Sequence, residues 1–283
     1  SGTVTYSGTT ATFTPSTSLT SSPTYTATIT TGAKDLAGNS IVSNYVWSFT
    51  TGTSAGPTGM LDPTFGTGGI VTTNLGADFA NAVAIQADGN IVAAGQSCTP
   101  DCGFALARYR PDGTLDPSFG TGGIVTTLIG DTSVANALAI QADGKIVVAG
   151  LSCILVDCDF TLARYNTNGV IDDTFGTRGI VVTQIGDTSI ADALAIQTDG
   201  KIVVAGSTFG GLTLARYDTN GTIDTTFGTG GIITNADIGG GPAFIALQTD
   251  GKIVSGSGSG LARYNTNGNL DTTFGTNGIV SGS

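Results

Sequence analysis

Aspartate is the only acidic residue in this sequence, because its 21 acidic side chains include no glutamate, and histidine is also absent. Nucleophilic catalysis pairs a serine or cysteine with a base, most often histidine, and that base is missing here. What remains is a large set of carboxylate and amide oxygens, which suit hard cations such as calcium and can also bind sugar hydroxyls. These residue types predict a protein without a catalytic centre or a required cofactor, for which calcium or a polar ligand is the chemistry to consider.

Four arginines each precede an aspartate by eight residues: Arg108 and Asp116, Arg164 and Asp172, Arg216 and Asp224, Arg263 and Asp271. Between the partners lies a turn such as Asn-Thr-Asn-Gly, which is typical of a three-residue hairpin ending in a left-handed glycine. In that register Arg164 faces Asp172 across two strands. We therefore expect four structural ion pairs inside a repeated unit, and no catalytic or anion-binding role for these arginines.

A second set of polar residues lies just before or at the start of another repeated strand: Asp78, Asn81, Asp131, Asn136, Asp187, Asp192 and Asp237. If this strand is the innermost of its unit, these side chains rim a central channel. The simplest interpretation is the polarity of solvated loops. The alternative is a site for calcium or a glycan, although no segment has the spacing of a calcium-binding loop, so we predict no metal from the motifs.

The four cysteines form two close pairs, Cys98 with Cys102 and Cys153 with Cys158. Each pair falls at the same place in its repeat, on opposite arms of a short loop. A zinc site would need four convergent ligands, and these pairs lie in different repeats. We expect two local disulfides, which predict an oxidising, extracellular compartment.

The elements that position these residues recur about every 50 residues, which is the period of a propeller blade. The phrase Leu-Asp-Pro-Thr-Phe-Gly begins at residue 61 and returns in variant form at 115, 171, 223 and 270. One unit reads as four strands, here called a to d: 135–141, 145–150, 160–165 and 179–183. The glycines after each Phe are followed by a strand and not a helix, so they are turn residues and not a phosphate loop. We predict an all-β fold with a β-propeller of about four four-stranded blades.

The net charge of −11 argues against nucleic acid as a partner, because phosphates need a basic surface. No apolar run approaches the ~20 residues that cross a bilayer, so we expect no membrane insertion. The N-terminus lacks the pattern of a signal peptide, and we expect a mature product or a fragment.

The strings Ala-Ile-Gln-Ala-Asp-Gly-Lys-Ile-Val-Val-Ala-Gly and Leu-Ala-Arg-Tyr-Asn-Thr-Asn-Gly resemble the delta-60 repeats, a family of bacterial, mostly secreted or surface-borne propeller repeats. The resemblance covers residues 59–283. Residues 1–53 are rich in Ser and Thr, with alternating strands at 24–29 and 45–50, and resemble the C-terminal half of a bacterial Ig-like domain from surface-layer proteins and adhesins. Residues 54–58 are expected to be a linker.

The strand count leaves one d segment over, because four a–b–c sets are accompanied by five d segments. Either the chain is part of a longer protein with more blades, or neighbouring copies complete one another by exchanging a strand. The sequence thus predicts an extracellular or cell-surface bacterial protein with a structural or adhesive role, which assembles with copies of itself or with the rest of a longer surface protein. The alternative is a ligand-binding propeller that takes a glycan or depends on calcium.

Overall fold

The computed structural model divides the chain into two compact units, Ser1–Asp62 and Pro63–Ser283. It describes residues 2–7, 10–17, 19, 24–34, 38–50, 60–75 and 77–282. The expected linker, 54–58, lies outside the described residues.

The first unit consists of two antiparallel hairpins. One pairs β1 (Gly2–Ser7) with β2 (Thr10–Pro15), and the other pairs β3 (Thr24–Ile29) with β4 (Tyr45–Thr50). The strands β3 and β4 have the predicted bounds. In β3, the residues Tyr25, Ala27 and Ile29 alternate with threonines, and Tyr25 and Ala27 are half-buried. The second hairpin stacks Tyr25 on Phe49, with ring centroids 5.9 Å apart.

The second unit is an array of four antiparallel blades with the strand order a–b–c–d. The first blade consists of β5 (Ala77–Ile85), β6 (Ile91–Cys98), β7 (Cys102–Tyr109) and β8 (Ile124–Thr127), and the second of β9 (Thr132–Ile140), β10 (Ile146–Ile154), β11 (Asp157–Tyr165) and β12 (Ile180–Thr183). The third blade consists of β13 (Ser189–Ile196), β14 (Ile202–Thr208), β15 (Gly211–Tyr217) and β16 (Ile232–Asn235). The fourth consists of β17 (Phe244–Leu247), β18 (Ile253–Ser257), β19 (Gly260–Tyr264) and β20 (Ile279–Ser281). A single parallel bridge, Cys102 to Thr132, links the first two blades. The predicted all-β fold with four four-stranded blades is confirmed.

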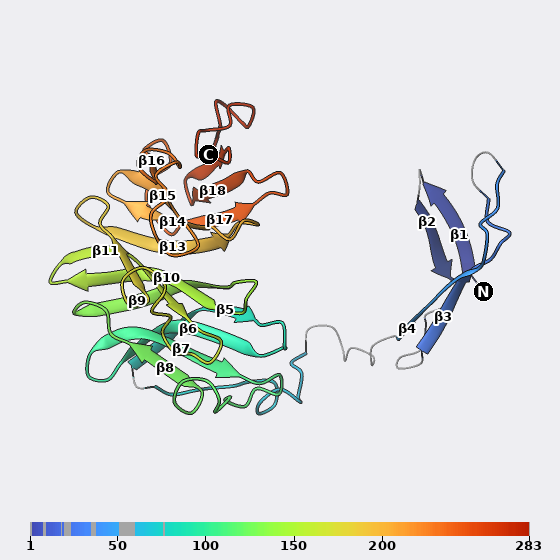
Figure 1. Ribbon diagram of the computed structural model, residues 1–283, viewed down its shortest axis with the longest axis horizontal. Helices are drawn as coiled ribbons and strands as arrows, with labels where there is room; N and C mark the ends of the chain where they lie inside the picture. Colours follow the sequence, from blue (N-terminus) through green and yellow to red (C-terminus); the bar gives the residue numbers. More distant parts are fainter. Residues whose placement is uncertain are drawn as a thin grey trace. The chain divides into compact units, whose positions relative to one another are not determined.

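The blades form an open array. In Figure 1 they follow one another from β5–β8 to β17–β20, and the first and last blades lie at opposite ends of the unit. The a strands are adjacent, since β5 contacts β9, β9 contacts β13 and β13 contacts β17. Among the described residues, no strand of the fourth blade pairs with a strand of the first. Each blade thus has a front face toward the preceding blade and a back face toward the following one.

Tight turns set the register within a blade. At the a–b turn of the second blade, the Gln141 amide donates to the Lys145 carbonyl at 2.8 Å, and Gly144, with a φ of 82°, donates to the Gln141 carbonyl at 2.9 Å. The c–d turn repeats the arrangement at Asn166–Val170, and Tyr165 then bridges to Ile171. This is the predicted hairpin, in which only glycine takes the left-handed position without strain.

The hydrophobic cores lie between blades and not inside them. Phe160 and Leu162 on the back of the second blade pack in one cluster with Ile202 and Val204 on the front of the third. Equivalent clusters join the first blade to the second and the third to the fourth. Each fully buried aliphatic or aromatic side chain contributes roughly 1.5–3 kcal/mol. A blade is therefore stabilised mainly by its neighbours.

Candidate functional site

All four arginine–aspartate pairs are present in the structure. Arginine Nε donates to aspartate Oδ2 at 2.8 Å in Arg108–Asp116, 2.7 Å in Arg164–Asp172, 2.7 Å in Arg216–Asp224 and 2.8 Å in Arg263–Asp271. The arginine and the aspartate of each pair lie opposite each other because the three-residue turn between strands c and d fixes the register. The pair recurs in all four blades.

Each arginine also contacts a phenylalanine, and the arginines of the first three blades contact the next blade. The Arg164 guanidinium lies over the Phe175 ring, 4.5 Å from its centroid, and its Nη1 donates to the Thr219 carbonyl in the c–d turn of the third blade. We call Arg164, Asp172, Thr174 and Phe175 an arginine cluster, together with its equivalents in the other blades. The contact to the following blade recurs from Arg108 to Thr167 and from Arg216 to Thr266.

The aspartate of the cluster accepts hydrogen bonds on both of its carboxylate oxygens. Asp172 Oδ2 accepts from Arg164 and, at 2.9 Å, from Lys145 Nζ, while Oδ1 accepts from the Thr174 hydroxyl at 2.7 Å and from its amide at 3.2 Å. Burial alone would raise the pKa of Asp172, but the hydrogen bonds from Lys145 and Thr174 and the charge of Arg164 outweigh it and hold the pKa well below its ordinary value. Such a carboxylate stays ionised and is poorly suited to exchange a proton with a substrate near neutral pH.

The lysines were not anticipated from the sequence. Lys145, Lys201 and Lys252 each follow the Asp-Gly of an a–b turn and reach the cluster aspartate of their own blade at 2.8–2.9 Å. The signal that could have found them is the recurrence of Asp-Gly-Lys in three repeats. In the first blade Asn90 takes this position, and Arg110 lies 4.0 Å from Asp116.

Three residues predicted to rim a channel form hydrogen bonds between neighbouring blades. Asn81 Nδ2 donates to the Ala135 carbonyl and Asn136 Nδ2 donates to the Ala191 carbonyl, both at 2.9 Å. Asp192 Oδ2 accepts from the Ala243 amide at 3.0 Å, and burial raises the pKa of its carboxyl. Asn81, Asn136 and Asp192 sit where the a strands bulge, which turns each side chain toward the next blade.

The four loop aspartates are held locally or lie exposed. Asp78 Oδ2 accepts from the Leu75 amide at 3.3 Å, and Asp131 Oδ2 accepts from the Leu155 amide at 2.8 Å. Asp187 is exposed, and the Asp237 amide donates to Asn235. Within the described part of the chain, no three Asp, Glu, His or Cys residues gather as metal ligands would. Of the predicted ligand-binding residues, Asn81 and Asn136 contact each other, because Nδ2 of Asn81 donates to Oδ1 of Asn136 at 3.5 Å.

Both expected disulfides are present. Cys98 pairs with Cys102 and Cys153 with Cys158, with Cα atoms 3.9 and 4.0 Å apart. The partners lie directly opposite each other in the ladders of strands b and c, so each bond closes a hairpin. Closing so short a loop contributes about 2 kcal/mol in the chain-entropy model.

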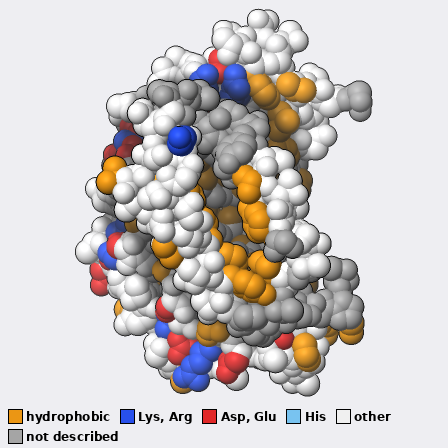
Figure 2. All heavy atoms as spheres, turned by 90° about the vertical axis from the view of Figure 1, so that its right-hand side faces the viewer, with side chains coloured by type: hydrophobic (Ala, Val, Ile, Leu, Met, Phe, Trp, Pro, Cys, Tyr) orange, Lys and Arg blue, Asp and Glu red, His pale blue; other side chains and the backbone are white. Residues whose placement is uncertain are grey.

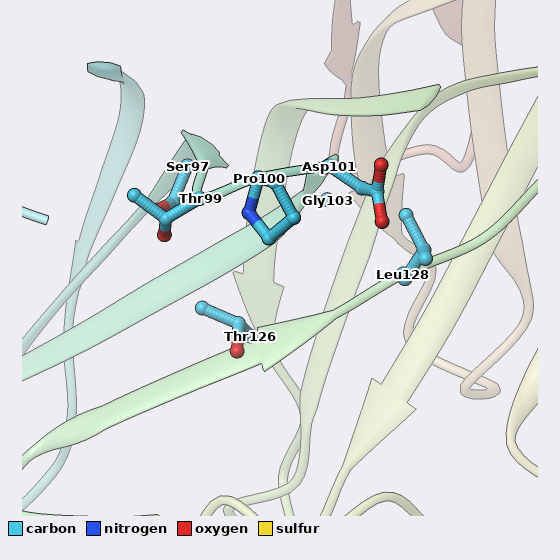
Figure 3. A pocket seen from close by; sticks show the side chains of 7 residues that line it. All are labelled: Ser97, Thr99, Pro100, Asp101, Gly103, Thr126 and Leu128. Atoms are coloured by element: carbon cyan, nitrogen blue, oxygen red, sulfur yellow. The ribbon is translucent and has the colours of Figure 1, made fainter. Parts of the chain in front are cut away.

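A pocket of about 160 Å³ lies beside the first disulfide loop (Figure 3). Its wall combines the loop residues Thr99, Pro100 and Asp101 with Thr126 and Leu128 at the end of β8. Asp101 is the one ionisable group among the lining residues. The lining also includes Ser97, whose hydroxyl donates to the Leu75 carbonyl at 2.9 Å, and it offers Asp101 no histidine or second carboxylate as a partner.

The surface carries its charges in small groups. On the face shown in Figure 2, acidic and basic side chains lie in mixed clusters separated by uncharged ones. This pattern differs from the continuous basic surface of a nucleic-acid-binding protein. A helix able to cross a membrane is not found among the described residues.

Buried tyrosines predict a loss of stability in alkali. The Tyr165 hydroxyl donates to Thr127 Oγ1 at 2.8 Å, and burial raises the pKa of Tyr165 to about 12. A folded-state pKa above the ordinary value of 10.0 favours the neutral form, so this stabilisation is complete below pH 10 and is lost as the pH rises toward 12. The melting temperature should therefore fall steeply above pH 10. The Tyr165→Phe variant should show a smaller fall between pH 9 and 11 than the parent chain, and an unchanged fall would contradict the assignment.

Family comparisons match both units. A bacterial Ig-like domain model matches residues 1–51, and the domain of unknown function (DUF5122) beta-propeller matches residues 86–119, 141–175, 197–227 and 248–274. No curated protein matches the sequence. The predicted resemblance to an Ig-like domain followed by propeller repeats is thereby confirmed.

Solved structures with similar folds come from several functional classes. A gluconolactonase from Xanthomonas campestris has 16% identity and a TM-score of 0.42, with 68% of this chain and 60% of that chain covered. An endo-arabinase from Bacteroides thetaiotaomicron has 12% identity and a TM-score of 0.38, covering 70% and 72%. PorZ, a surface component of the type-IX secretion system of Porphyromonas gingivalis, has 12% identity and a TM-score of 0.36, covering 78% and 30%. This chain thus spans less than two thirds of the gluconolactonase, and similarities of this size carry no argument about activity.

Proposed function

We propose, for a chain that joins a bacterial Ig-like domain to DUF5122 β-propeller repeats, a structural and adhesive role outside the cell, without catalysis. The observation that carries the proposal is the contact each internal arginine cluster makes with the next blade. Arg108, Arg164 and Arg216 all reach a carbonyl of the following c–d turn. The arginine clusters of the first three blades thus connect neighbouring blades, as a structural array requires.

Two observations support an extracellular location. The disulfides at Cys98–Cys102 and Cys153–Cys158 fit an oxidising compartment, and a bacterial Ig-like domain is consistent with a secreted or surface protein. Exposed hairpin tips closed by disulfides would also resist proteolysis. A structural role outside the cell requires both an oxidising compartment for the disulfides and resistance to proteases.

The absence of an enzymatic role is part of this proposal. The sequence offers no histidine or glutamate, and the cluster aspartates are occupied by arginine, lysine and threonine donors. The alternative function, a propeller that binds glycan or calcium, has less support because Asn81, Asn136 and Asp192 bond to neighbouring blades.

We further propose that the array is continued by other blades, from a longer parent protein or from neighbouring copies that exchange an outer strand. The support is the open front face of the first blade. Val83 and Ile85 on β5 are 67% and 70% exposed, whereas their equivalents Leu138 and Ile140 pack against the preceding blade. An apolar strand face of this kind is normally covered in a native protein.

Self-association tests this proposal. Sedimentation velocity on the full chain should show concentration-dependent species larger than the 28.1 kDa monomer, and electron microscopy should show them as end-to-end particles. The Ile85→Asp variant should reduce the larger species. A matched control is Ile154→Asp, because Ile154 is 66% exposed at a hairpin tip away from the blade faces. A strictly monomeric chain, or equal effects of the two variants, would contradict assembly between copies and leave a longer parent protein as the proposed source of the other blades.

A further inference from the structure

The b–c hairpin of the second blade ends in three consecutive exposed aliphatic residues, Ile154, Leu155 and Val156. Leu155 and Val156 form the turn between β10 and β11, and Leu155 is 86% exposed. At the equivalent turn of the third blade, between β14 and β15, Phe209 is 91% exposed. We call these four residues the apolar tips. A run of exposed apolar residues is disfavoured in a folded protein unless it serves a function.

Leu155 has a backbone conformation that leucine rarely adopts. Its φ of 58° lies in the left-handed region, which two-residue hairpin turns usually fill with glycine or asparagine. Other contacts hold this hairpin. The Cys153–Cys158 disulfide closes it, and the Leu155 amide donates to Asp131 Oδ2 at 2.8 Å. The Asp131 amide in turn donates to the Cys153 carbonyl at 2.8 Å. The leucine thus does not stabilise its own turn, and the braced hairpin holds its side chain in solvent.

The charges on the same end of the blades are all negative. Antiparallel strands place the b–c turns and the d–a connections at one end of each blade, which we call the tip end, and the a–b and c–d turns at the other end. In the second unit, the lysines follow a–b turns, and the arginines lie near the end of strand c or in the segment that leads to strand d. None of these basic residues is therefore at the tip end. The aspartates at the tip end are Asp78, Asp101, Asp131, Asp157, Asp159, Asp187 and Asp237.

We propose that the apolar tips are a docking surface for a basic, amphipathic segment of another protein. Apolar side chains of that segment would cover Leu155 and Phe209, and its lysines or arginines would pair with Asp131 and Asp157. Both carboxylates are exposed beside the longer tip, since Asp131 accepts from the Leu155 amide and Asp157 pairs with Ile154 in the ladder. The inference goes beyond the proposed structural role and does not depend on the continuation of the array.

Charge decides between this partner and two others. An anionic bilayer would accept the aliphatic side chains, but its surface repels the aspartates of the tip end. The tip end of a second copy would carry the same negative charge. The lysines of a second copy, Lys145, Lys201 and Lys252, already pair with the aspartates of their own clusters. A basic segment with apolar side chains complements both the tips and the carboxylates around them.

Three synthetic peptides test whether binding needs both properties. The probe is a fluorescent peptide of leucine and lysine, about 14 residues long with helical amphipathic spacing. One control peptide has serine in place of each leucine, and the other has glutamate in place of each lysine. In fluorescence anisotropy, the full chain should bind the leucine–lysine peptide at least about tenfold more tightly than either control. Equal binding of the serine–lysine peptide would show charge attraction only, and equal binding of the leucine–glutamate peptide would show that charge plays no part. Either result would overturn the proposal.

The Leu155→Gly variant tests the location. Glycine removes the side chain and adopts a φ of 58° without strain, so the melting temperature should stay unchanged or rise. Binding of the leucine–lysine peptide should weaken about tenfold, the effect of losing one buried leucine side chain. The matched control is Val170→Ala, because Val170 is also exposed but follows the c–d turn at the opposite end of the same blade. Equal binding by the two variants would overturn the proposal.

A second pair of variants tests the charges. Asp157→Asn should weaken binding of the leucine–lysine peptide at low salt and reduce its dependence on salt. The control Asp143→Asn changes an a–b turn at the opposite end and should leave binding unchanged, because an asparagine oxygen can still accept from the Lys145 amide. Equal effects of these two substitutions would contradict the assignment. Sedimentation of the full chain with phosphatidylcholine or phosphatidylglycerol vesicles, if Leu155→Gly abolished it, would assign the tips to a membrane and overturn the proposal.

Discussion

The Arg164→Leu variant should lose about 3 kcal/mol of its free energy of unfolding, a large share of the stability of a typical domain. The substitution removes the charge partner of a buried carboxylate, the guanidinium over the Phe175 ring and the bond to the Thr219 carbonyl of the third blade. Asp172 keeps Lys145 and Thr174 as donors, which limits the loss. Urea unfolding followed by circular dichroism measures the change.

The matched control is Arg263→Leu in the last blade. Arg263 makes the same contacts with Asp271 and Phe274, but its side chain is 20% exposed, against 8% for Arg164. Within the described residues, no blade follows the fourth and offers Arg263 a carbonyl. The loss should therefore be less than half of that at Arg164. Equal losses would show that the contact between blades adds nothing to the ion pair.

Replacing Gly150 by alanine should destabilise the second blade by about 3 kcal/mol. A Cβ at Gly150 would lie 1.9 Å from the Val134 carbonyl oxygen, beside the bulge of the a strand at Asn136, which lies between Ala135 and Ala137. The obstacle is backbone, which cannot move aside as a flexible side chain can. Gly95 and Gly206 occupy the same position in the first and third blades and have the same close approach. Thermal unfolding of the variant measures the effect.

The fourth blade supports this steric explanation and offers a control substitution. Its a strand, β17, pairs with β18 without a bulge, and Ser257 stands where the other blades have this glycine. Gly258, the next residue, has nothing within 4 Å of an added Cβ. The Gly258→Ala variant should therefore leave the melting temperature nearly unchanged. A similar fall in both variants would contradict the steric explanation.

The blade structure could be predicted from the sequence because its determinants are local. The glycine of each turn fixes the hairpin, the hairpin fixes the register, and the register places Arg164 opposite Asp172. The cysteine pairs follow from the same logic, since Cys153 and Cys158 stand directly across a short hairpin. These contacts depend on residues fewer than ten positions apart.

Contacts between blades could not be predicted in the same way. The third bond of Arg164 goes to Thr219, 55 residues away, and depends on how one sheet is stacked on the next. The same limit explains Asn81 and Asn136. Both were expected at the start of strand a, whereas β5 and β9 begin four residues earlier, at Ala77 and Thr132. The bulge that points them toward the next blade arises from the a–b pairing.

An open row of blades, each with its apolar core shared with the next, has a consequence for how the molecule comes apart. The three clusters join consecutive blades, so a terminal blade is supported from one side and an internal blade from two. Stability in such an array is a sum of unit energies and nearest-neighbour couplings, as in a one-dimensional Ising chain. Amide protons should therefore exchange fastest in the fourth blade and slowest in the second and third, with unfolding that frays inward from the ends. A partner that closed the row into a ring would remove both ends and turn this gradual fraying into a single cooperative transition.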